Sequence, residues 1–372
     1  MKKIFRFLNI YWLFFRIVKE VKSPTTITGK KISDIIFSII NKNKNKQKNN
    51  ILLCFYDLNI APITYNFCEF LVMCNKETLS KGFKKYKIIF LKKNFESKIN
   101  QVTQHKIYNQ IHNKNSIEWR FSNIIIPLIS CSESCSGYDI IEEDKELENY
   151  LKYRNIYPKT FSKFIRQHVD TYEIYNHYEN LKNIGLTPPS NGIYYINKLF
   201  EKISKNKKII TITLRIQEFD KARNSNIKSW VKFAYFAREN GFEPIIIPDT
   251  DDPYITDNDF KDFIIFHEGS FNLMLRMSLY SYVYFNFFAG GGPSSLCYLS
   301  ENNKYIMFNY GPVKNSIVHT KEAFNKFKEQ PIDKFKFANS NQILVWKEDT
   351  YDNIVESFNK HLLNTKTFKT LN

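Results

Sequence analysis

The amino-acid sequence predicts an α/β protein with two domains, each built around a parallel sheet. The chain has 372 residues, which is long enough for two domains of ordinary size. Hydrophobic residues make up 43% and charged residues 24%, a composition typical of globular proteins. Short apolar segments alternate with segments of helical spacing in both halves of the chain, and this order is typical of parallel sheets.

The first 50 residues differ from the rest in charge. They contain 12 Lys or Arg and 2 acidic residues, a net charge of +10 out of +17 for the whole chain. Residues 1–22 combine basic side chains with bulky aromatic and aliphatic ones, and the apolar run at 7–15 is too short to span a bilayer. We therefore expect a basic amphipathic helix that lies on an anionic membrane surface, the alternative being a helix packed on the protein itself. Residues 42–50 are typical of a polar linker.

Several functional classes are not expected. Most of the basic excess belongs to the N-terminal arm, and no helix-turn-helix, RNP or zinc-finger signature is present, so nucleic acid is not a predicted partner. Cys131 and Cys135 have no second Cys/His pair at metal-ligand spacing nearby. We expect reduced thiols in a cytoplasmic protein, and no metal site.

The first predicted domain spans residues 51–190. Residues 65–74 have the apolar spacing of a helix, and residues 139–205 are predicted to be mainly helical and charged. The predicted strands are short apolar runs at 51–56, 87–91 and 123–127. The small polar loop at 130–137 follows the last of these strands.

The second predicted domain spans residues 191–372, after a proline-rich boundary at 187–192. Its predicted strands are apolar runs at 208–214, 243–247, 262–266, 282–288, 305–308 and 342–346. Its predicted helices cover 227–240, 271–281 and about 350–363.

The most informative stretch follows the strand at 282–288. Three of the chain's 11 glycines are consecutive here, and a proline and two serines come next. Glycines allow a sharp turn and the close approach of a ligand, and a helix N-terminus presents unpaired N–H groups to an anion. A turn without any ligand is an equally weighted alternative. The residues predicted to seat a phosphate are Gly290, Gly291, Gly292, Pro293, Ser294 and Ser295.

Two arginines lie beyond the strand at 208–214. Ligands of doubly wound sheets bind at the carboxyl ends of strands, which is where Arg215 and Arg223 are expected. A guanidinium group matches phosphate oxygens bidentately, so we predict that both arginines clamp a diphosphate, with Asn224 beside them. Arg215 is expected to face the ligand and to support no core. Surface salt bridges are the alternative role, and Asn224, Ser225 or Asn226 is expected to cap the next helix.

These motifs resemble those of a known enzyme class. Residues 287–296, Phe-Phe-Ala-Gly-Gly-Gly-Pro-Ser-Ser-Leu, resemble the Gly-Pro loop in the second domain of heptosyltransferase-like glycosyltransferases of the GT-B type, which have two facing Rossmann-like domains. Residues 212–215, Ile-Thr-Leu-Arg, resemble the strand-end arginine with which related fucosyltransferases hold the donor diphosphate. The layout from 51 to about 363 is similar to such proteins. The resemblance implies a metal-independent transferase that uses a nucleotide-sugar donor and no other cofactor.

A transferase of this kind requires a general base for the acceptor hydroxyl. Asp57 ends the first strand and is the preferred candidate, and Glu133 in the polar loop is the second. Glu268 is placed to reach the nucleotide, although a helix cap formed by Ser270 explains that stretch equally well. The Asp-Thr-Asp spacing at 249–251 is interpreted as a structural turn and not as a metal site.

The preferred function is therefore a glycosyltransferase of polysaccharide biosynthesis, peripheral on the cytoplasmic face of the cell membrane. It would move a sugar to a surface polysaccharide or a lipid-linked acceptor. A sugar-nucleotide 2-epimerase of the same fold and a non-catalytic nucleotide-sugar-binding protein remain as alternatives. The basic arm favours the transferase, because an epimerase gains nothing from membrane contact.

Overall fold

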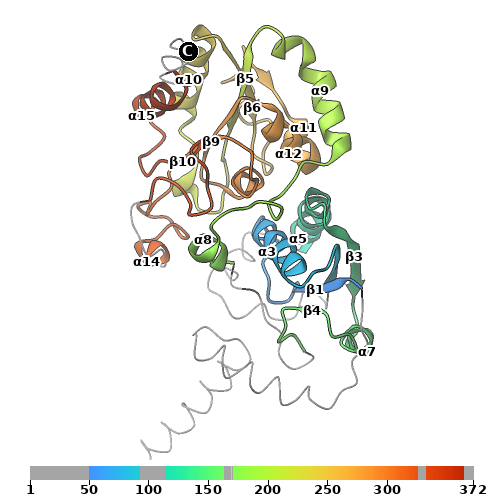
Figure 1. Cartoon of the computed structure of the whole chain (residues 1–372). Helices are drawn as coiled ribbons and strands as arrows, with labels where there is room; N and C mark the ends of the chain where they lie inside the picture. The colour runs from blue at the N-terminus through green and yellow to red at the C-terminus, as the bar shows by residue number, and fades with distance from the viewer. Residues whose placement is uncertain (1–49, 93–113, 163–168, 170, 326–331, 364–372) are drawn as a thin grey trace, which may run out of the picture. The chain divides into compact units, whose positions relative to one another are not determined.

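The computed structural model describes most of the chain (Figure 1). The described residues are 50–92, 114–162, 169, 171–325 and 332–363. The predicted amphipathic helix at 1–22 lies outside them, so it stays a prediction.

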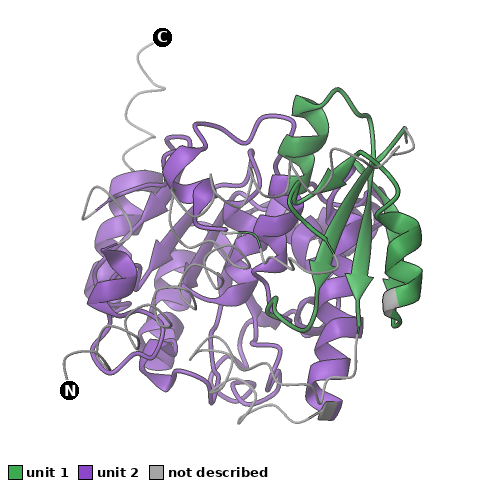
Figure 2. Ribbon diagram, turned by 90° about the horizontal axis from the view of Figure 1, so that it is seen from below, with its two compact units in different colours: residues 1–62, 74–102, 134–170 green, residues 63–73, 103–133, 171–372 purple. Residues whose placement is uncertain are grey.

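The described residues form two compact units, coloured separately in Figure 2. Neither unit is one continuous stretch of chain. The first unit takes its residues from 1–62, 74–102 and 134–170, and the second takes its residues from 63–73, 103–133 and 171–372. The single boundary that we predicted at 187–192 stays a prediction.

The first unit contains a four-stranded parallel sheet in the order β3-β2-β1-β4. All six residues of β1 are buried, as expected for a strand covered on both faces. The chain passes from β1 to β2 to β3 in one direction and then places β4 on the other side of β1. The strands are β1 (Leu52–Asp57), β2 (Tyr86–Leu91), β3 (Cys135–Ile141) and β4 (Ile156–Tyr157).

The predicted strand at 123–127 is wrong. Phe121–Ile125 is a π-helical turn that continues α5 (Lys114–Arg120) and leads into α6 (Ile126–Leu128). The buried residues of this stretch are spaced i, i+3, i+4 and i+7, which is the period of a helix. The buried residues with this spacing are Phe121, Ile124, Ile125 and Leu128. Consecutive β-branched isoleucines are also typical of a strand, and for that reason the segment was predicted as one. The predicted loop at 130–137 is also partly wrong, because β3 begins at Cys135.

The second unit contains a six-stranded parallel sheet in the order β10-β9-β8-β5-β6-β7. Numbered from β5 as the first strand, this is the 3-2-1-4-5-6 order of Rossmann folds, with its strands on the two sides of β5. The predicted strands of this half are confirmed with small shifts in their ends. They are β5 (Lys208–Thr213), β6 (Phe242–Ile247), β7 (Ile264–Ile265), β8 (Phe285–Ala289), β9 (Tyr305–Phe308) and β10 (Gln342–Leu344).

Helices cover both faces of the second sheet (Figure 1). α10 and α15 pack together on one face, and α12 packs with α9 on the other. Asn226 caps α10, as one of the predicted alternatives, and Gly241 ends it with a φ of +84°. The helices of the two units are α3 (Phe67–Ser80), α7 (Asp144–Tyr150), α8 (Glu173–His177), α9 (Ser190–Ser204), α10 (Ile227–Glu239), α11 (Glu268–Phe271), α12 (Leu273–Tyr282), α13 (Ser295–Tyr298), α14 (Lys321–Phe324) and α15 (Tyr351–Phe358).

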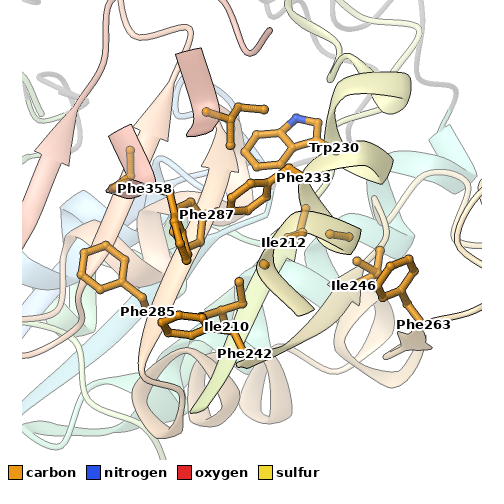
Figure 3. Packing of buried hydrophobic residues seen from close by; sticks show 14 of the residues in the cluster. Ile210, Ile212, Trp230, Phe233, Phe242, Ile246, Phe263, Phe285, Phe287 and Phe358 are labelled. Carbon is orange, nitrogen blue, oxygen red and sulfur yellow. The ribbon is translucent and has the colours of Figure 1, made fainter. Parts of the chain in front are cut away.

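The core between the second sheet and α10 is rich in aromatic side chains (Figure 3). Phe233 of α10 packs against Phe287 of β8 and Phe358 of α15, with ring centroids 5.1 and 5.4 Å apart. Each such buried side chain stabilises the fold by about 1.5–3 kcal/mol. This packing fixes β5 and β8 side by side, and their carboxyl ends form the candidate site below.

The predicted α/β class with two Rossmann-like domains is confirmed by the two parallel sheets. All six cysteines are free thiols. Among the described residues, no helix has both the length and the apolar character needed to cross a membrane.

Candidate functional site

The second sheet has its topological switch point between β5 and β8. The chain moves from β5 to β6 and β7 on one side and then returns to place β8 on the other side. Thr213 pairs with Phe288, so the segments that follow these two strands leave the same edge of the sheet. A crevice of this kind is where doubly wound sheets bind ligands. Sequence positions about seventy residues apart therefore meet here, as we predicted for Arg215 and the glycine turn.

Arg215 lies two residues beyond β5 and is only 4% exposed. Its guanidinium donates to the carbonyl oxygens of Phe219 (2.7 Å) and Asp220 (3.1 Å). A third hydrogen bond reaches the side-chain oxygen of Asn224 (2.5 Å). Arg215 was expected to face a ligand and to support no core, and its contacts give it a further role, because these bonds hold the loop after β5 in its shape. Asn224 is engaged in the same loop through both ends of its amide, since its Nδ2 donates to the carbonyl of Gln217.

Arg223 connects this loop to the glycine turn. Its Nη2 donates to the carbonyl oxygen of Gly290 (2.7 Å), and its Nη1 lies 3.8 Å from the carboxylate of Asp220. Its Nε is buried without a hydrogen-bond partner in the described part of the chain. Burial, and then the charge of Arg215, lower the pKa of Arg223 to about 9. A bound anion would stabilise a cation in this environment.

The glycine turn packs closely against two side chains. A Cβ at Gly291 would lie 3.4 Å from Cδ of Arg215, and one at Gly292 would lie 2.7 Å from Cδ2 of Tyr65. Gly291 has an extended φ of −150°, which any residue adopts. At Gly292, close approach of the Tyr65 ring requires the glycine, whereas 3.4 Å at Gly291 is an ordinary van der Waals distance.

The expected phosphate seat at a helix N-terminus is weaker than predicted. α13, which follows the turn, is only four residues long and contributes little macrodipole. The Ser294 hydroxyl donates to the carbonyl of Gly291, and the Ser295 hydroxyl donates to that of Gly292 (2.8 Å). Both serines therefore bind back to the turn. Pro293 is buried in the short 3₁₀ turn that links the glycines to α13. Attraction for an anion at this edge comes mainly from the arginines.

A second polar cluster, which sequence reasoning missed, adjoins the glycine turn. The Tyr65 hydroxyl interacts with the nearby Thr250 hydroxyl, but neither of them, nor Arg276 Nη1, makes a hydrogen bond of good geometry within the described residues, although all three are buried. Arg276 is completely buried in α12, and its other nitrogens donate to the carbonyls of Gly269 (2.5 Å) and Pro248 (3.1 Å). Burial raises the pKa of Tyr65, and the charge of Arg276 and the hydroxyl of Thr250 oppose that shift. Buried polar groups without partners are costly, so this cluster is suited to the oxygens of a bound molecule.

The acidic residues at 249–251 have structural partners, in line with their predicted interpretation. Asp249 accepts hydrogen bonds from the backbone N–H groups of Ile216 (2.8 Å) and Thr250 (2.6 Å). Burial raises the pKa of Asp249. Asp251 pairs with Arg120 at 2.6 Å. In the ranges that the structure describes, no group of three His, Cys, Asp or Glu side chains is placed to hold a metal ion.

Glu268 begins α11, beyond the carboxyl end of β7, and its side chain is exposed. The alternative role for this stretch, a cap formed by Ser270, is wrong. Ser270 is inside α11 and donates its hydroxyl to the carbonyl of Pro248 (2.9 Å), whereas Asn272 caps α12. Within the described ranges, no hydrogen bond or ion pair links Glu268 to the arginines of the β5–β8 edge, so its donor-binding role stays a prediction.

The first unit has its own switch point between β1 and β4, and Asp57 ends β1 there. Asp57 is 2% exposed, and its Oδ1 accepts hydrogen bonds from the backbone N–H (3.0 Å) and the amide (2.7 Å) of Asn59. Glu133 is not at this edge. Glu133 is exposed in the turn that precedes β3, and the segment before it is helical, not the expected strand. Because β3 runs parallel to β2, its amino end lies at the edge of the sheet opposite to the one where Asp57 ends β1.

No family model and no curated protein matches the chain. The solved structures that resemble it include an ADP-heptose lipopolysaccharide heptosyltransferase II of E. coli (11% identity, 85% of this chain and 100% of that chain, TM-score 0.48). They also include a family 9 glycosyl transferase of Veillonella parvula (9%, 86% and 98%, 0.40) and the E. coli heptosyltransferase WaaC with ADP (11%, 85% and 100%, 0.37). With TM-scores below 0.5, these likenesses carry no functional conclusion, so the proposal below depends on the geometry of the site.

Proposed function

We propose that the chain is a glycosyltransferase that moves a sugar from a nucleotide-diphosphate donor to a surface polysaccharide or a lipid-linked acceptor. The observation that supports this most is the β5–β8 edge. There, Arg223 is half-buried with a lowered pKa and donates to the carbonyl of Gly290, and Arg215 lies in the same loop beside the glycine turn. This combination suits a diphosphate, whose two negative groups would compensate the two guanidinium charges.

The donor is proposed to bind chiefly through Arg223. Arg215 and Asn224 shape the loop that carries Arg223, and Gly292 lets the Tyr65 ring pack against the turn beside it. The sugar or ribose would lie toward Tyr65 and Arg276, whose unpartnered groups would meet its hydroxyls. In the first unit, Asp57 at the β1–β4 switch point is proposed as the base that deprotonates the acceptor. No metal ion and no cofactor other than the donor are part of this proposal.

The setting that we propose for the reaction is the cytoplasmic face of the cell membrane. Residues 1–50 carry a net charge of +10, and residues 1–22 have the mixed basic and aromatic composition of an interfacial helix. An acceptor linked to a lipid is confined to that surface, so an enzyme held there meets it at a high local concentration.

The donor site can be tested with Arg223→Met, which keeps the apolar stem and removes the charge. Nucleoside diphosphates of uridine, guanosine, cytidine and adenosine, and their sugar conjugates, are titrated calorimetrically into the full chain. The variant is expected to bind the ligand preferred by the wild type at least about tenfold more weakly, because a hydrogen bond to a charged group contributes about 1.5–3 kcal/mol.

A matched control is Arg238→Met, which removes the same charge from an arginine of α10 that pairs with Glu243 at 3.1 Å. It should leave nucleotide affinity unchanged. Equal affinity of wild type and Arg223→Met for every nucleotide would exclude the donor site. Conversion of a bound nucleotide-sugar into its epimer without any acceptor would show that the chain is an epimerase and not a transferase.

A further inference from the structure

One exposed surface of the second unit has no role in the proposed donor site. α9 buries Ile196 and Phe200, which are spaced i, i+4 and are 0% and 4% exposed. Its other side carries large apolar side chains in solvent. Tyr194 and Tyr195 are each 60% exposed, and Leu199 is 56% exposed. A surface helix normally turns polar side chains to water, so this composition indicates a binding surface.

The apolar character continues beyond α9. A Cβ at Gly192 would lie 2.9 Å from the carbonyl oxygen of Met274, so α9 touches the start of α12 at this point. Met274 is 37% exposed, and Phe271, three residues before it, is 44% exposed. The ring of Phe271 in turn lies 6.4 Å from that of Tyr254, which is 60% exposed. Exposed aromatic and aliphatic side chains thus extend from α9 onto its neighbours.

The same helix also carries basic side chains. Within Ser190–Ser204 there are two lysines and one glutamate, and Lys205, Lys207 and Lys208 follow the helix. Lys205 pairs with Glu201 at 3.1 Å, and Lys207 pairs with Glu243 at 2.7 Å. Lys198 and Lys202 are exposed, and neither has an ion pair with another described residue. We call Tyr194, Tyr195, Lys198, Leu199 and Lys202 the α9 face.

We propose that the α9 face binds an anionic lipid surface. Lysines without carboxylate partners are attracted to anionic headgroups, which complement them in charge. Tyrosines are favoured at the membrane–water boundary, because their rings are apolar and their hydroxyls stay hydrated. A 15-residue amphipathic helix lying in the plane of the interface presents both kinds of side chain at once.

The α9 face is independent of the donor site, because it shares no residue with the loops after β5 and β8. It is also independent of the predicted N-terminal helix, so it would give the second unit its own contact with the membrane. The proposal therefore stands or fails separately from the proposed reaction, and nucleotide titrations of the variants below report on the donor site alone.

The charge contribution is tested with the full chain carrying Lys198→Glu and Lys202→Glu. Vesicles of phosphatidylglycerol mixed with phosphatidylcholine are compared with vesicles of phosphatidylcholine alone, by co-sedimentation. The matched control is Lys228→Glu with Lys232→Glu, two exposed lysines with the same spacing on α10. Binding to the anionic vesicles should fall at least about tenfold for the α9 pair and less than about twofold for the α10 pair.

The apolar contribution is tested with Tyr195→Ser and Leu199→Ser together. Both side chains are exposed, so the thermal unfolding midpoint should stay the same while vesicle binding falls about tenfold. An equal loss in the two lysine pairs would show that binding follows net charge, and would overturn the proposal. Unchanged binding in both α9 variants would also overturn it. A change of oligomeric state in these variants without lipid, with vesicle binding intact, would identify the α9 face as a contact between copies of the chain instead.

Discussion

The first strands of the two units end in opposite charges. β1 ends in Asp57, whose carboxylate accepts two hydrogen bonds from Asn59, and β5 is followed by Arg215, whose guanidinium donates to four groups of its own loop. Both side chains are almost completely buried, at 2% and 4% exposure. In each unit the side chain lies at the carboxyl end of the strand beside the switch point of the sheet. Each side chain makes hydrogen bonds within the loop that follows its strand.

The difference lies in what the neighbouring strands contribute. At the β5–β8 edge, Arg223 adds a second cation, and Gly292 lets the Tyr65 ring pack against the turn. The loop from 57 to 64 in the first unit contains no glycine and no arginine. The two sheets share the order 3-2-1-4 at their switch points, and this order supports different chemistry, a candidate anion site in one unit and a candidate base in the other. The predictions below test this division of roles.

The largest effect is expected for Asp57→Asn, which keeps an oxygen that can accept from Asn59 and removes the basic carboxylate. Sugar transfer should fall by about 10²–10⁴-fold, the usual contribution of a positioned general base. Donor affinity should not change, because the donor is proposed to bind in the second unit. Release of nucleoside diphosphate in the presence of an acceptor preparation measures the rate.

The control for this prediction is Glu133→Gln, at an exposed side chain in the turn that precedes β3. It should transfer sugar at nearly the wild-type rate. If Glu133→Gln abolishes transfer and Asp57→Asn does not, the base is not at the β1–β4 switch point and the division of roles is wrong.

A smaller effect is expected for Gly292→Ala. The new methyl group would lie 2.7 Å from Cδ2 and 3.3 Å from Cγ of the buried Tyr65 ring, which must move. Overpacking of this kind lowers the unfolding free energy by about 1–3 kcal/mol, measurable by urea denaturation. Gly290→Ala is the matched control, because its nearest neighbours are at 3.7 Å, and it should be tolerated. Equal stability of the two variants would mean that close approach does not explain the glycine run.

The smallest effect concerns Glu69, a buried carboxylate of the second unit that accepts from the hydroxyls of Tyr175 (2.7 Å) and Tyr298 (3.1 Å). Burial raises its pKa above the ordinary value of 4.5, although the two hydroxyls oppose the shift. Above pH 4.5, Glu69 therefore holds a proton more often in the folded protein than in the unfolded chain. Its unfolding free energy should therefore fall as pH rises from about 4.5 through the folded pKa.

Glu69→Gln should remove this part of the pH dependence, as measured by urea unfolding at several pH values. Glu356→Gln is the control, because Glu356 is exposed and its pKa is lowered by Lys347, so it should leave the decline above pH 4.5 in place. An unchanged slope in Glu69→Gln would show that the carboxylate is not held in its neutral form by burial.

The sequence predicted the edge of the second sheet well because parallel strands deliver their carboxyl ends together. Apolar runs located β5 and β8, and the arginines and glycines that follow them then had to meet. What the sequence did not show is how Arg215 is used. Two of its four partners are backbone carbonyls of its own loop, and backbone carbonyls cannot be recognised from residue types.

Tyr65, Arg120 and Arg276 were missed for different reasons. Tyr65 lies before α3 in a loop of ordinary composition, and Arg120 lies in a helical segment next to a run that we interpreted as a strand. Arg276 did leave a signal, because it is the one basic residue in the otherwise uncharged helix Leu-Met-Leu-Arg-Met-Ser-Leu-Tyr-Ser-Tyr. An arginine in such a helix is either exposed on a polar face or buried against polar partners. Arg276 is completely buried.

The interleaving of the two units along the chain determines the order of events during synthesis. Residues 63–73 belong to the second unit although they leave the ribosome early, and Glu69 meets Tyr298 only 229 residues later. Such long-range contacts form slowly. Until they form, the segments that will make them expose surface that chaperones can bind and that can aggregate. The arginine edge is therefore completed only near the end of translation. A nascent chain stalled before residue 298 presents the Glu69 side of α3 to solvent.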